Sequence, residues 1–96
     1  MITKYAPSIF PHKEGCDLCR RQDRPLQRHE PFGGPFRQRS KELGCWLMVC
    51  DECHRRIHQK DALYAHEVKQ LMQLQAMEHY GWTVEEFRLY FGKNYI

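Results

Sequence analysis

Residues 50–58 read Cys-Asp-Glu-Cys-His-Arg-Arg-Ile-His, a Cys-x-x-Cys knuckle that runs directly into two histidines four residues apart. A second knuckle, Cys-Asp-Leu-Cys, occupies residues 16–19. Thiolates offered in pairs at this spacing are typical of tetrahedral Zn²⁺ sites, and two pairs close such a site without an open position. A redox Cys-x-x-Cys would not come twice. The spacing therefore predicts one structural zinc ion bound by Cys16, Cys19, Cys50 and Cys53.

The chain has 96 residues, the size of one small domain. Such a chain buries a modest core, so zinc binding would contribute folding free energy. We expect residues 1–96 to form a single domain, with the zinc-bound core in 1–59 and a helical extension in 60–96. The first residues lack the apolar segment of a secretion signal, and no apolar run has the length of a membrane span. We therefore expect a cytoplasmic protein with reduced thiols and no membrane partner.

The net charge of +3, from 15 Lys and Arg against 12 Asp and Glu, is too small to imply nucleic acid by itself. Its distribution is more informative, because basic residues gather in the segment 20–41. A local excess of this kind can neutralise phosphates, although a solvated loop is an equally good interpretation. The basic residues of the segment are Arg20, Arg21, Arg24, Arg28, Arg37, Arg39 and Lys41, against Asp23 and Glu30.

The first half of the chain has the pattern of short strands joined by irregular segments. Prolines indicate an extended lead-in over residues 1–15, and a strand with a turn is expected at 24–32. The Gly-Gly-Pro sequence at 33–35 excludes helix there. A short basic segment at 36–44, helical or irregular, ends at a glycine, and the apolar run 46–49 predicts a second strand.

From about residue 51 the pattern becomes helical. The helix that begins there carries both histidines, and a longer helix is expected at 60–79, ended by Gly81. Thr83 and Glu86 form the sequence of a capping box, which starts a last helix. The residues expected near the buried side of the long helix are Leu63, Val68, Leu71 and Met72, with Gln75 or Met77. The residues available for packing in the last helix are Val84, Phe87, Leu89, Tyr90 and Phe91.

His54 and His58 are the first two members of a second candidate metal site. Their spacing places both imidazoles on one face of a helix, within reach of one ion. His29, on the first predicted strand, supplies a third imidazole. The remaining histidines, at 12, 66 and 79, have no partner at ligand spacing, and Cys45 is expected to pack as a small apolar residue beside Trp46.

These motifs in this order resemble the HNH endonuclease family, whose fold is called ββα-metal. The matching parts are the first Cys-x-x-Cys, His29 on a strand, and residues 46–58. The loop Phe-Gly-Gly-Pro at 32–35 and the tail Phe-Gly-Lys-Asn-Tyr at 91–95 are similar to small HNH proteins of phages and bacterial mobile elements. The resemblance implies an α+β fold, with a ββα-metal core held by a four-cysteine zinc site and extended by C-terminal helices.

The resemblance also implies a function: metal-dependent hydrolysis of DNA phosphodiester bonds. His29, His54 and His58 would bind one catalytic divalent ion (Mg²⁺, Mn²⁺, Ni²⁺ or Zn²⁺), and His29, Glu30 and His54 would take part in catalysis. DNA would be the partner, together with phage packaging or recombination proteins, in the cytoplasm of a bacterial host. We expect the following basic residues near the metal, gripping the DNA backbone: Arg37, Arg39 and Lys41.

The chain departs from the family pattern at two places. The family's metal ligand is followed by a catalytic histidine, whereas here His29 is followed by Glu30. Either His29 is a ligand and Glu30 stands at the position of the base, or the register slips by one, so that Arg28 takes the ligand position and His29 is the base. Adjacent side chains of a regular strand point to opposite faces, so the two residues of the pair cannot both point at the metal in either register. The second departure is Cys45, which stands where the family has an asparagine that orients the base.

Two further functions fit the sequence. One is a catalytically weak or inactive zinc-bound module for nucleic-acid binding or phage assembly, which Glu30 and Cys45 favour. The other is a protein-interaction adaptor, which would require an exposed apolar stripe along residues 60–79.

Overall fold

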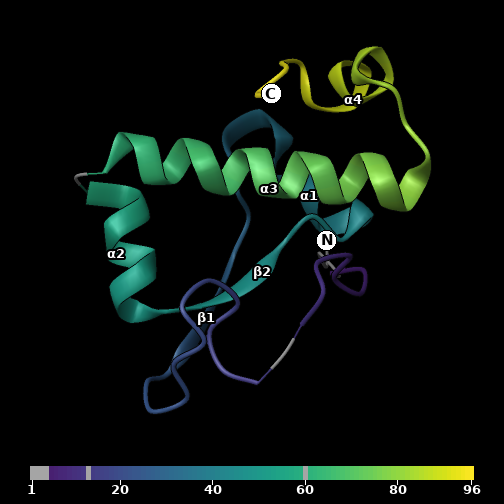
Figure 1. The fold of residues 1–96 in the computed structure, drawn as a ribbon. Helices are drawn as coiled ribbons and strands as arrows, with labels where there is room; N and C mark the ends of the chain where they lie inside the picture. The colour runs from purple at the N-terminus through teal and green to yellow at the C-terminus, as the bar shows by residue number, and fades with distance from the viewer. Residues whose placement is uncertain (1–4, 13, 60) are drawn as a thin grey trace.

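The computed structural model describes residues 5–12, 14–59 and 61–96 (Figure 1). It is an α+β structure in which a two-stranded antiparallel hairpin is followed by helices. The elements in chain order are β1 (Leu26–His29), the 3-10 helix η1 (Gly34–Phe36), α1 (Arg37–Leu43), β2 (Leu47–Cys50), α2 (Asp51–Gln59), α3 (Ala62–Tyr80) and α4 (Val84–Phe91).

The hairpin pairs Leu26 with Cys50 and His29 with Leu47. Its two strands are joined by the long connection that contains η1 and α1, and β2 continues into α2 without a loop. The prediction that Gly-Gly-Pro excludes helix at 33–35 is wrong for η1, because Pro35 lies in its first turn, where the missing amide has no helical partner to lose. Because side chains alternate along a strand, Gln27 and His29 share one face of β1 and Arg28 lies on the other. Figure 1 shows the hairpin beneath α3, with α2 linking the two at one end.

The lead-in, residues 5–12, is without helix or strand, as predicted, while residues 1–4 and 13 lie outside the described residues. It packs beside α1. The amide of Ile9 donates to the carbonyl of Gly44 (2.9 Å), and the indole of Trp46 donates to the carbonyl of Ala6 (2.7 Å). Gly44 has φ +73°, and a Cβ there would lie 2.2 Å from the carbonyl oxygen of Pro7. Only glycine allows this contact between α1 and the lead-in.

The predicted helix ends are confirmed in the C-terminal half. Asp61 caps α3 by accepting a hydrogen bond from the amide of Tyr64 (2.9 Å), and Gly81 ends the helix with φ +69°. Thr83 and Glu86 form the predicted capping box of α4. The helix α4 then folds back over α3, and the chain ends beside both (Figure 1). Lys60, in the predicted 60–79 helix, lies outside the described residues.

The buried face of α3 differs in part from the predicted one. Val68 and Met72 are buried as expected, but Leu63 and Leu71 are 68% and 45% exposed, so their predicted burial is wrong. The helix turns the stripe that includes Val68, Met72 and Ala76 toward Phe87 and Phe91 of α4 and toward the hairpin. Leu63 lies on the opposite side of the helix. In α4, Leu89 is 78% exposed, so its predicted packing is wrong. Tyr90 is 39% exposed but packs as predicted, because its ring stacks on Trp82 with 4.3 Å between the centroids.

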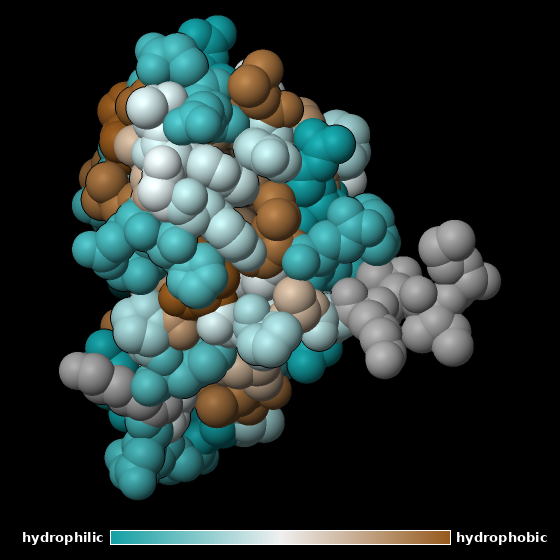
Figure 2. All heavy atoms as spheres, turned by 90° about the vertical axis from the view of Figure 1, so that its right-hand side faces the viewer, coloured by the Kyte–Doolittle hydropathy of each residue, from teal (hydrophilic) through white to brown (hydrophobic). Residues whose placement is uncertain are grey.

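Within the described residues, none of the helices is long and apolar enough to cross a membrane. Figure 2 shows the face at the right-hand side of Figure 1, where apolar side chains lie in separate groups between hydrophilic ones.

Candidate metal centres

The four knuckle cysteines form one cluster. All four Sγ atoms lie within 4.8 Å of one another. Cys50 ends β2, Cys53 lies in the first turn of α2, and Cys16 and Cys19 come from the loop before β1. No disulfide joins them, and the Sγ atoms of Cys19 and Cys50 are 3.7 Å apart. The predicted grouping is therefore confirmed, and its donor set suits structural Zn²⁺.

Backbone amides surround the sulfur of Cys16. Leu18, Cys19 and Cys50 donate to it at 3.4, 3.5 and 3.3 Å. Burial raises the pKa of the Cys16 thiol, but these hydrogen bonds outweigh it and lower the pKa to about 7. At Cys53 burial raises the pKa to about 12. Four sulfurs at this separation become thiolates together only with a cation among them, so the cluster fits a metal ion.

Asp17, between the two cysteines of the first knuckle, attaches that knuckle to β2. Its amide donates to the carbonyl of Met48, and its buried carboxylate accepts from the amide of Met48, both at 2.8 Å. The same carboxylate oxygen lies 2.8 Å from Nδ1 of His12. These contacts place His12 beside the first knuckle of the cysteine cluster, which its spacing in the sequence did not reveal.

The three predicted histidines form the second cluster. His29, the last residue of β1, is 7% exposed, and His54 and His58 lie on the adjacent face of α2. One nitrogen from each ring lies within 4.8 Å of the others, and the Nε2 atoms of His54 and His58 are 3.0 Å apart. The guanidinium of Arg28 instead lies over the rings of Tyr5 and Trp46, at 3.8 and 4.6 Å from their centroids. The register is thus the one in which His29, not Arg28, meets the histidines of α2.

The environment favours the neutral form of two of these imidazoles, His29 and His54. Burial, followed by the neighbouring charges of His54, His58 and Lys69, lowers the pKa of His29 to about 4. Burial and the proximity of His58 also lower the pKa of His54, against the opposing effect of Glu30. A neutral imidazole has a free lone pair, which is the form that binds metals. The donor set therefore fits a divalent ion.

Gln27 orients one of these rings. Its side-chain oxygen lies 2.5 Å from Nδ1 of His54. Because a carbonyl oxygen only accepts, Nδ1 carries the proton and Nε2 is left free to face His58 and a metal. The sequence contained a signal for this contact, because Gln27 is two residues before His29 and so shares its strand face.

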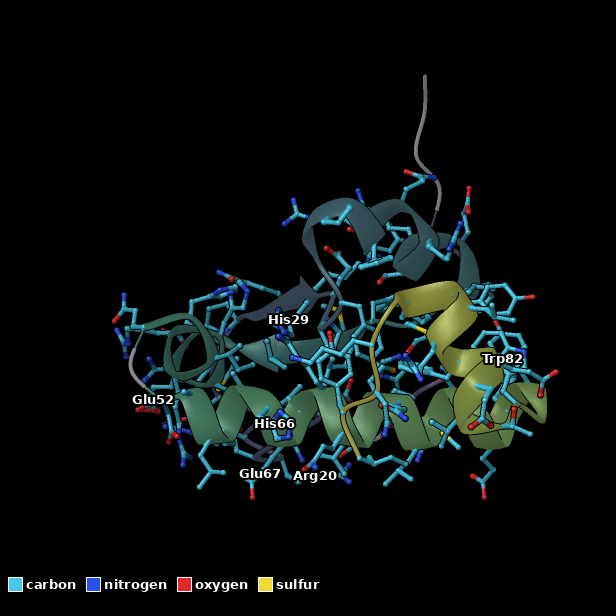
Figure 3. The ribbon with its side chains drawn as sticks, turned by 90° about the horizontal axis from the view of Figure 1, so that it is seen from above. Arg20, His29, Glu52, His66, Glu67 and Trp82 are labelled. Carbon is cyan, nitrogen blue, oxygen red and sulfur yellow. The ribbon has the colours of Figure 1, made fainter. Side chains whose placement is uncertain are left out.

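A cleft of about 430 Å³ opens beside the three histidines. Glu30 lines it with a side chain 11% exposed, held by the hydroxyl of Tyr5 at 2.5 Å and by Nε of Arg37 at 3.7 Å. Figure 3, seen from above, has His29 between α1 and α3. The cleft therefore combines imidazoles, one carboxylate and cations, and its lining residues include Arg28, His29, Glu30, Arg37, His54, His58 and Lys69.

The three predicted DNA-contacting residues lie in different places. Arg37 lines the cleft. Arg39 projects from the opposite face of α1 and donates to the carbonyl of Tyr90 at 2.8 Å, and Lys41 lies with its Nζ 5.2 Å from the centroid of Tyr5. Of the three, Arg37 alone lines the cleft. Arg39, two residues on, points to α4, whereas Lys41, four residues on, lies on the side of Arg37 but beside Tyr5.

Cys45 is fully buried, as predicted, and burial raises the pKa of its thiol to about 12. The position at which the family would have an asparagine is therefore part of the core.

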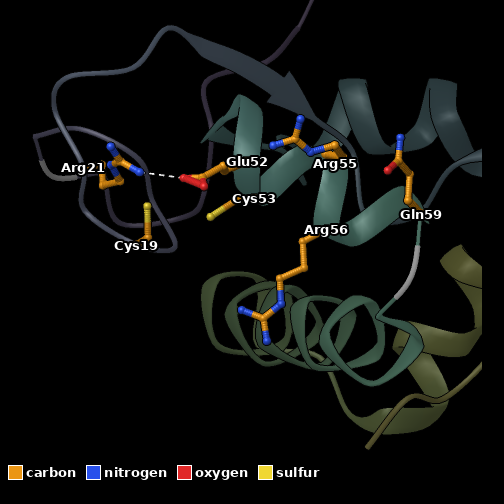
Figure 4. Close-up of a pocket in the computed structure, with 7 residues that line it drawn as sticks. All are labelled: Cys19, Arg21, Glu52, Cys53, Arg55, Arg56 and Gln59. Carbon is orange, nitrogen blue, oxygen red and sulfur yellow. Dashed lines mark hydrogen bonds and ion pairs between the residues drawn. The ribbon is translucent and has the colours of Figure 1, made fainter.

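A second cavity, of about 550 Å³, lies beside the cysteine cluster on another side of α2 (Figure 4). Its cations are largely engaged by carboxylates. Arg21 donates to Glu52 at 2.6 Å, and Arg56 pairs with Asp61 at 2.9 Å. Among the described residues, the third arginine of this cavity, Arg55, has no carboxylate partner, whereas in the histidine cleft both Arg28 and Lys69 lack one.

Comparison with known proteins leaves the family open, because no protein-family profile, curated protein or solved structure matches this chain.

Proposed function

We propose that this protein is a metal-dependent DNA endonuclease of the HNH type, with a structural zinc ion and a second, catalytic divalent ion. The observation that carries the proposal is the convergence of His29, from a strand end, with His54 and His58, from the helix that follows the hairpin. The order strand, strand, helix and the position of the three imidazoles support a ββα-metal core.

The three histidines would hold the divalent ion, which supplies a Lewis acid next to a phosphate oxygen. This use assigns His29 as a ligand. With its pKa lowered to about 4, the ring is a weak proton acceptor at neutral pH. Glu30 is the remaining proton acceptor of the cleft, and its hydrogen bond from Tyr5 fixes its carboxylate. We assign Glu30 the role of accepting a proton from the attacking water.

The substrate follows from the charges. A phosphodiester is anionic, and Arg37 offers its guanidinium at the cleft, where it can bind a backbone phosphate without reading sequence. DNA is therefore the proposed partner, and phage packaging or recombination proteins remain predictions from the resemblance alone.

Plasmid nicking tests this proposal. Zinc-loaded protein is incubated with supercoiled DNA and Mg²⁺, Mn²⁺, Ni²⁺ or added Zn²⁺. We expect nicking with at least one of these ions, and a loss of at least about a hundredfold in His29→Ala and His54→Ala, since each removes a ligand. His66→Ala is the matched control, because His66 is exposed on α3 and outside both clusters (Figure 3). Absence of nicking with every ion, in protein with intact structural zinc, would overturn the proposal.

The alternative of an inactive nucleic-acid-binding module is favoured by Cys45, which leaves a buried thiol where an orienting asparagine is expected. It predicts one tightly bound zinc per chain, no second metal, and DNA binding that His54→Ala does not change.

The adaptor alternative also has one observation in its favour. Leu63, Leu71 and Leu74 of α3 are exposed, which meets its requirement for an apolar stripe. The stripe is interrupted by Glu67 and Gln70, so it is narrower than a typical helix-binding surface.

A further inference from the structure

We propose that Lys69, in the helical extension, is a substrate-binding residue of the histidine cleft and holds a DNA phosphate together with Arg37. The inference rests on the proposed function, because it needs DNA in this cleft. It gives the extension a part in substrate binding, whereas the family resemblance located the binding residues in the core.

Lys69 lies at the histidine cleft. Lys69 comes from the middle of α3 and lines the same cleft as His29 and His58. Arg37 lines it from α1. The two cations thus come to the cleft from α1 and α3, and in Figure 3 His29 is seen between these two helices. A phosphate at the three histidines would therefore have a cation on either side.

The charge of Lys69 is available to an anionic ligand. Within residues 5–12, 14–59 and 61–96, no carboxylate forms an ion pair with it. Arg37, in contrast, has Glu30 at 3.7 Å. The charge of Lys69 also acts on the cleft, since it is one of the influences that lower the pKa of His29. An unpaired ammonium at the edge of a cleft is suited to an anionic ligand.

The C-terminal tail, through Tyr95, positions Lys69. Its Nζ lies 5.5 Å from the ring centroid of Tyr95. The side chain of Gln73 accepts from the amide of Tyr95 at 2.8 Å, and that of Gln70 donates to its carbonyl at 2.9 Å. The ring of Tyr95 also stacks on Phe32, at the start of the glycine-rich loop. The tail thus supports both the lysine and the loop that follows Glu30.

The tail also supplies a matched control. Lys93 lies over the ring of Tyr95 at 5.4 Å, almost the distance of Lys69, but it is not among the residues that line the cleft. Lys69→Met and Lys93→Met therefore remove the same charge from the same aromatic ring, and only the first removes a cation from the cleft. Lys69→Arg keeps the charge and serves as the rescue variant.

The experiment measures binding of a fluorescein-labelled DNA duplex to the zinc-loaded full chain without a second metal, by fluorescence anisotropy at several salt concentrations. We expect Lys69→Met to weaken binding about tenfold and to reduce the slope of log K against log salt by about 0.9, as for the loss of one phosphate contact. Lys93→Met should change the affinity less than about twofold, and Lys69→Arg should restore most of it. If Lys69→Met destabilises the fold, Lys69→Gln provides the same comparison.

Unchanged affinity and slope in Lys69→Met, or an equal loss in Lys93→Met, would overturn the inference. Binding is measured without cleavage, so the outcome is separate from that of the nicking test. If the protein nicks DNA but Lys69→Met binds DNA normally, only this inference is overturned. If Lys69→Met weakens binding as predicted but the protein does not nick DNA, the nuclease proposal is overturned and the cleft is a DNA-binding site only. If nicking occurs, Lys69→Met should raise KM more than it lowers kcat, because the contact is made to bound substrate.

Discussion

The cysteine cluster and the histidine cluster are built from the same helix but differ in what surrounds them. Cys53 and His54 are adjacent in α2, and each points to a different site. Four sulfurs, three of them on buried residues, form the first cluster. They would occupy all four positions around a tetrahedrally coordinated ion. Only three nitrogens form the second, beside an open cleft. A closed donor set suits a structural ion, and an open one leaves room for a ligand, so the same helix can serve folding and chemistry.

The difference also links the two sites. Zinc at the first cluster would fix the end of β2 and the start of α2, where Cys50 and Cys53 lie. The distance from that start to His54 and His58 is then set by the helix itself. We infer that the histidines of α2 meet His29 because the cysteines hold the hairpin against the helix.

The largest effect should follow from breaking the closed site. Cys50→Ser removes one of four ligands, and structural zinc contributes on the order of 10 kcal/mol to folding of small domains, so we expect loss of zinc and of the cooperative melt. Cys45→Ala is the matched control, since Cys45 is equally buried but outside the cluster. It should cost about 1–2 kcal/mol and keep zinc. Thermal melts with metal analysis measure both, and a folded, zinc-free Cys50→Ser protein would contradict a structural role.

A smaller effect is expected when the open site loses its orienting contact. Gln27→Ala removes the acceptor for Nδ1 of His54, and loss of such a partner typically weakens metal binding about 10- to 100-fold. Isothermal titration of Mn²⁺ or Ni²⁺ into zinc-loaded protein measures the change. Gln59→Ala, at an exposed position of α2, should leave the affinity unaltered. Equal affinities in all three proteins would show that the contact with Gln27 is not used.

A comparison within α1 tests which cations belong to the open site. Arg37→Ala should weaken DNA binding about fivefold, because Arg37 lines the cleft. Arg39→Ala removes a hydrogen bond to the carbonyl of Tyr90, so it should cost about 1 kcal/mol of stability and leave DNA affinity nearly unchanged. Anisotropy titrations paired with melting curves separate the two effects. If instead Arg39→Ala weakens DNA binding and Arg37→Ala does not, Arg39 and not Arg37 belongs to the DNA-binding surface.

The smallest effect concerns pH. Protons compete with metal for imidazole, and three histidines with the ordinary pKa of 6.5 would together lose roughly thirtyfold in affinity between pH 7 and pH 6. In the protein the pKa of His29 is about 4, so this ring remains largely free of protons in this range. The pKa of His54 is also lowered, so protons compete less with the metal there than at an ordinary imidazole. We expect the affinity for the second metal to fall less than about tenfold between pH 7 and pH 6. Titrations at the two pH values decide the matter, and a loss near thirtyfold would argue against the buried environment of His29.

Local patterns predicted the parts of this structure that depend on local chemistry. The spacing of the cysteines and of His54 and His58 is set within one knuckle or one helical turn, and both groupings are confirmed. The glycine after α3 and the capping box before α4 likewise act within a few residues, so these helix boundaries were predictable.

The contacts between distant segments were the ones that local patterns missed. Which face of α3 is buried depends on where α4 packs, and for this reason the predicted burial of Leu63 and Leu71 is wrong. Lys69 reaches the cleft only because α3 passes beside α2, forty residues along the chain from His29. Arg39 was assigned with Arg37 because both follow the glycine-rich loop in the sequence, whereas helical geometry points their side chains in different directions.

The most direct test of two distinct metal sites is a titration of Co²⁺ into the zinc-loaded protein, followed by absorption spectroscopy and metal analysis. The account predicts that one equivalent of Co²⁺ binds while zinc remains, without a thiolate charge-transfer band, and that His58→Ala loses this equivalent and retains zinc. A single metal per chain, or Co²⁺ binding that persists unchanged in His58→Ala, would contradict it.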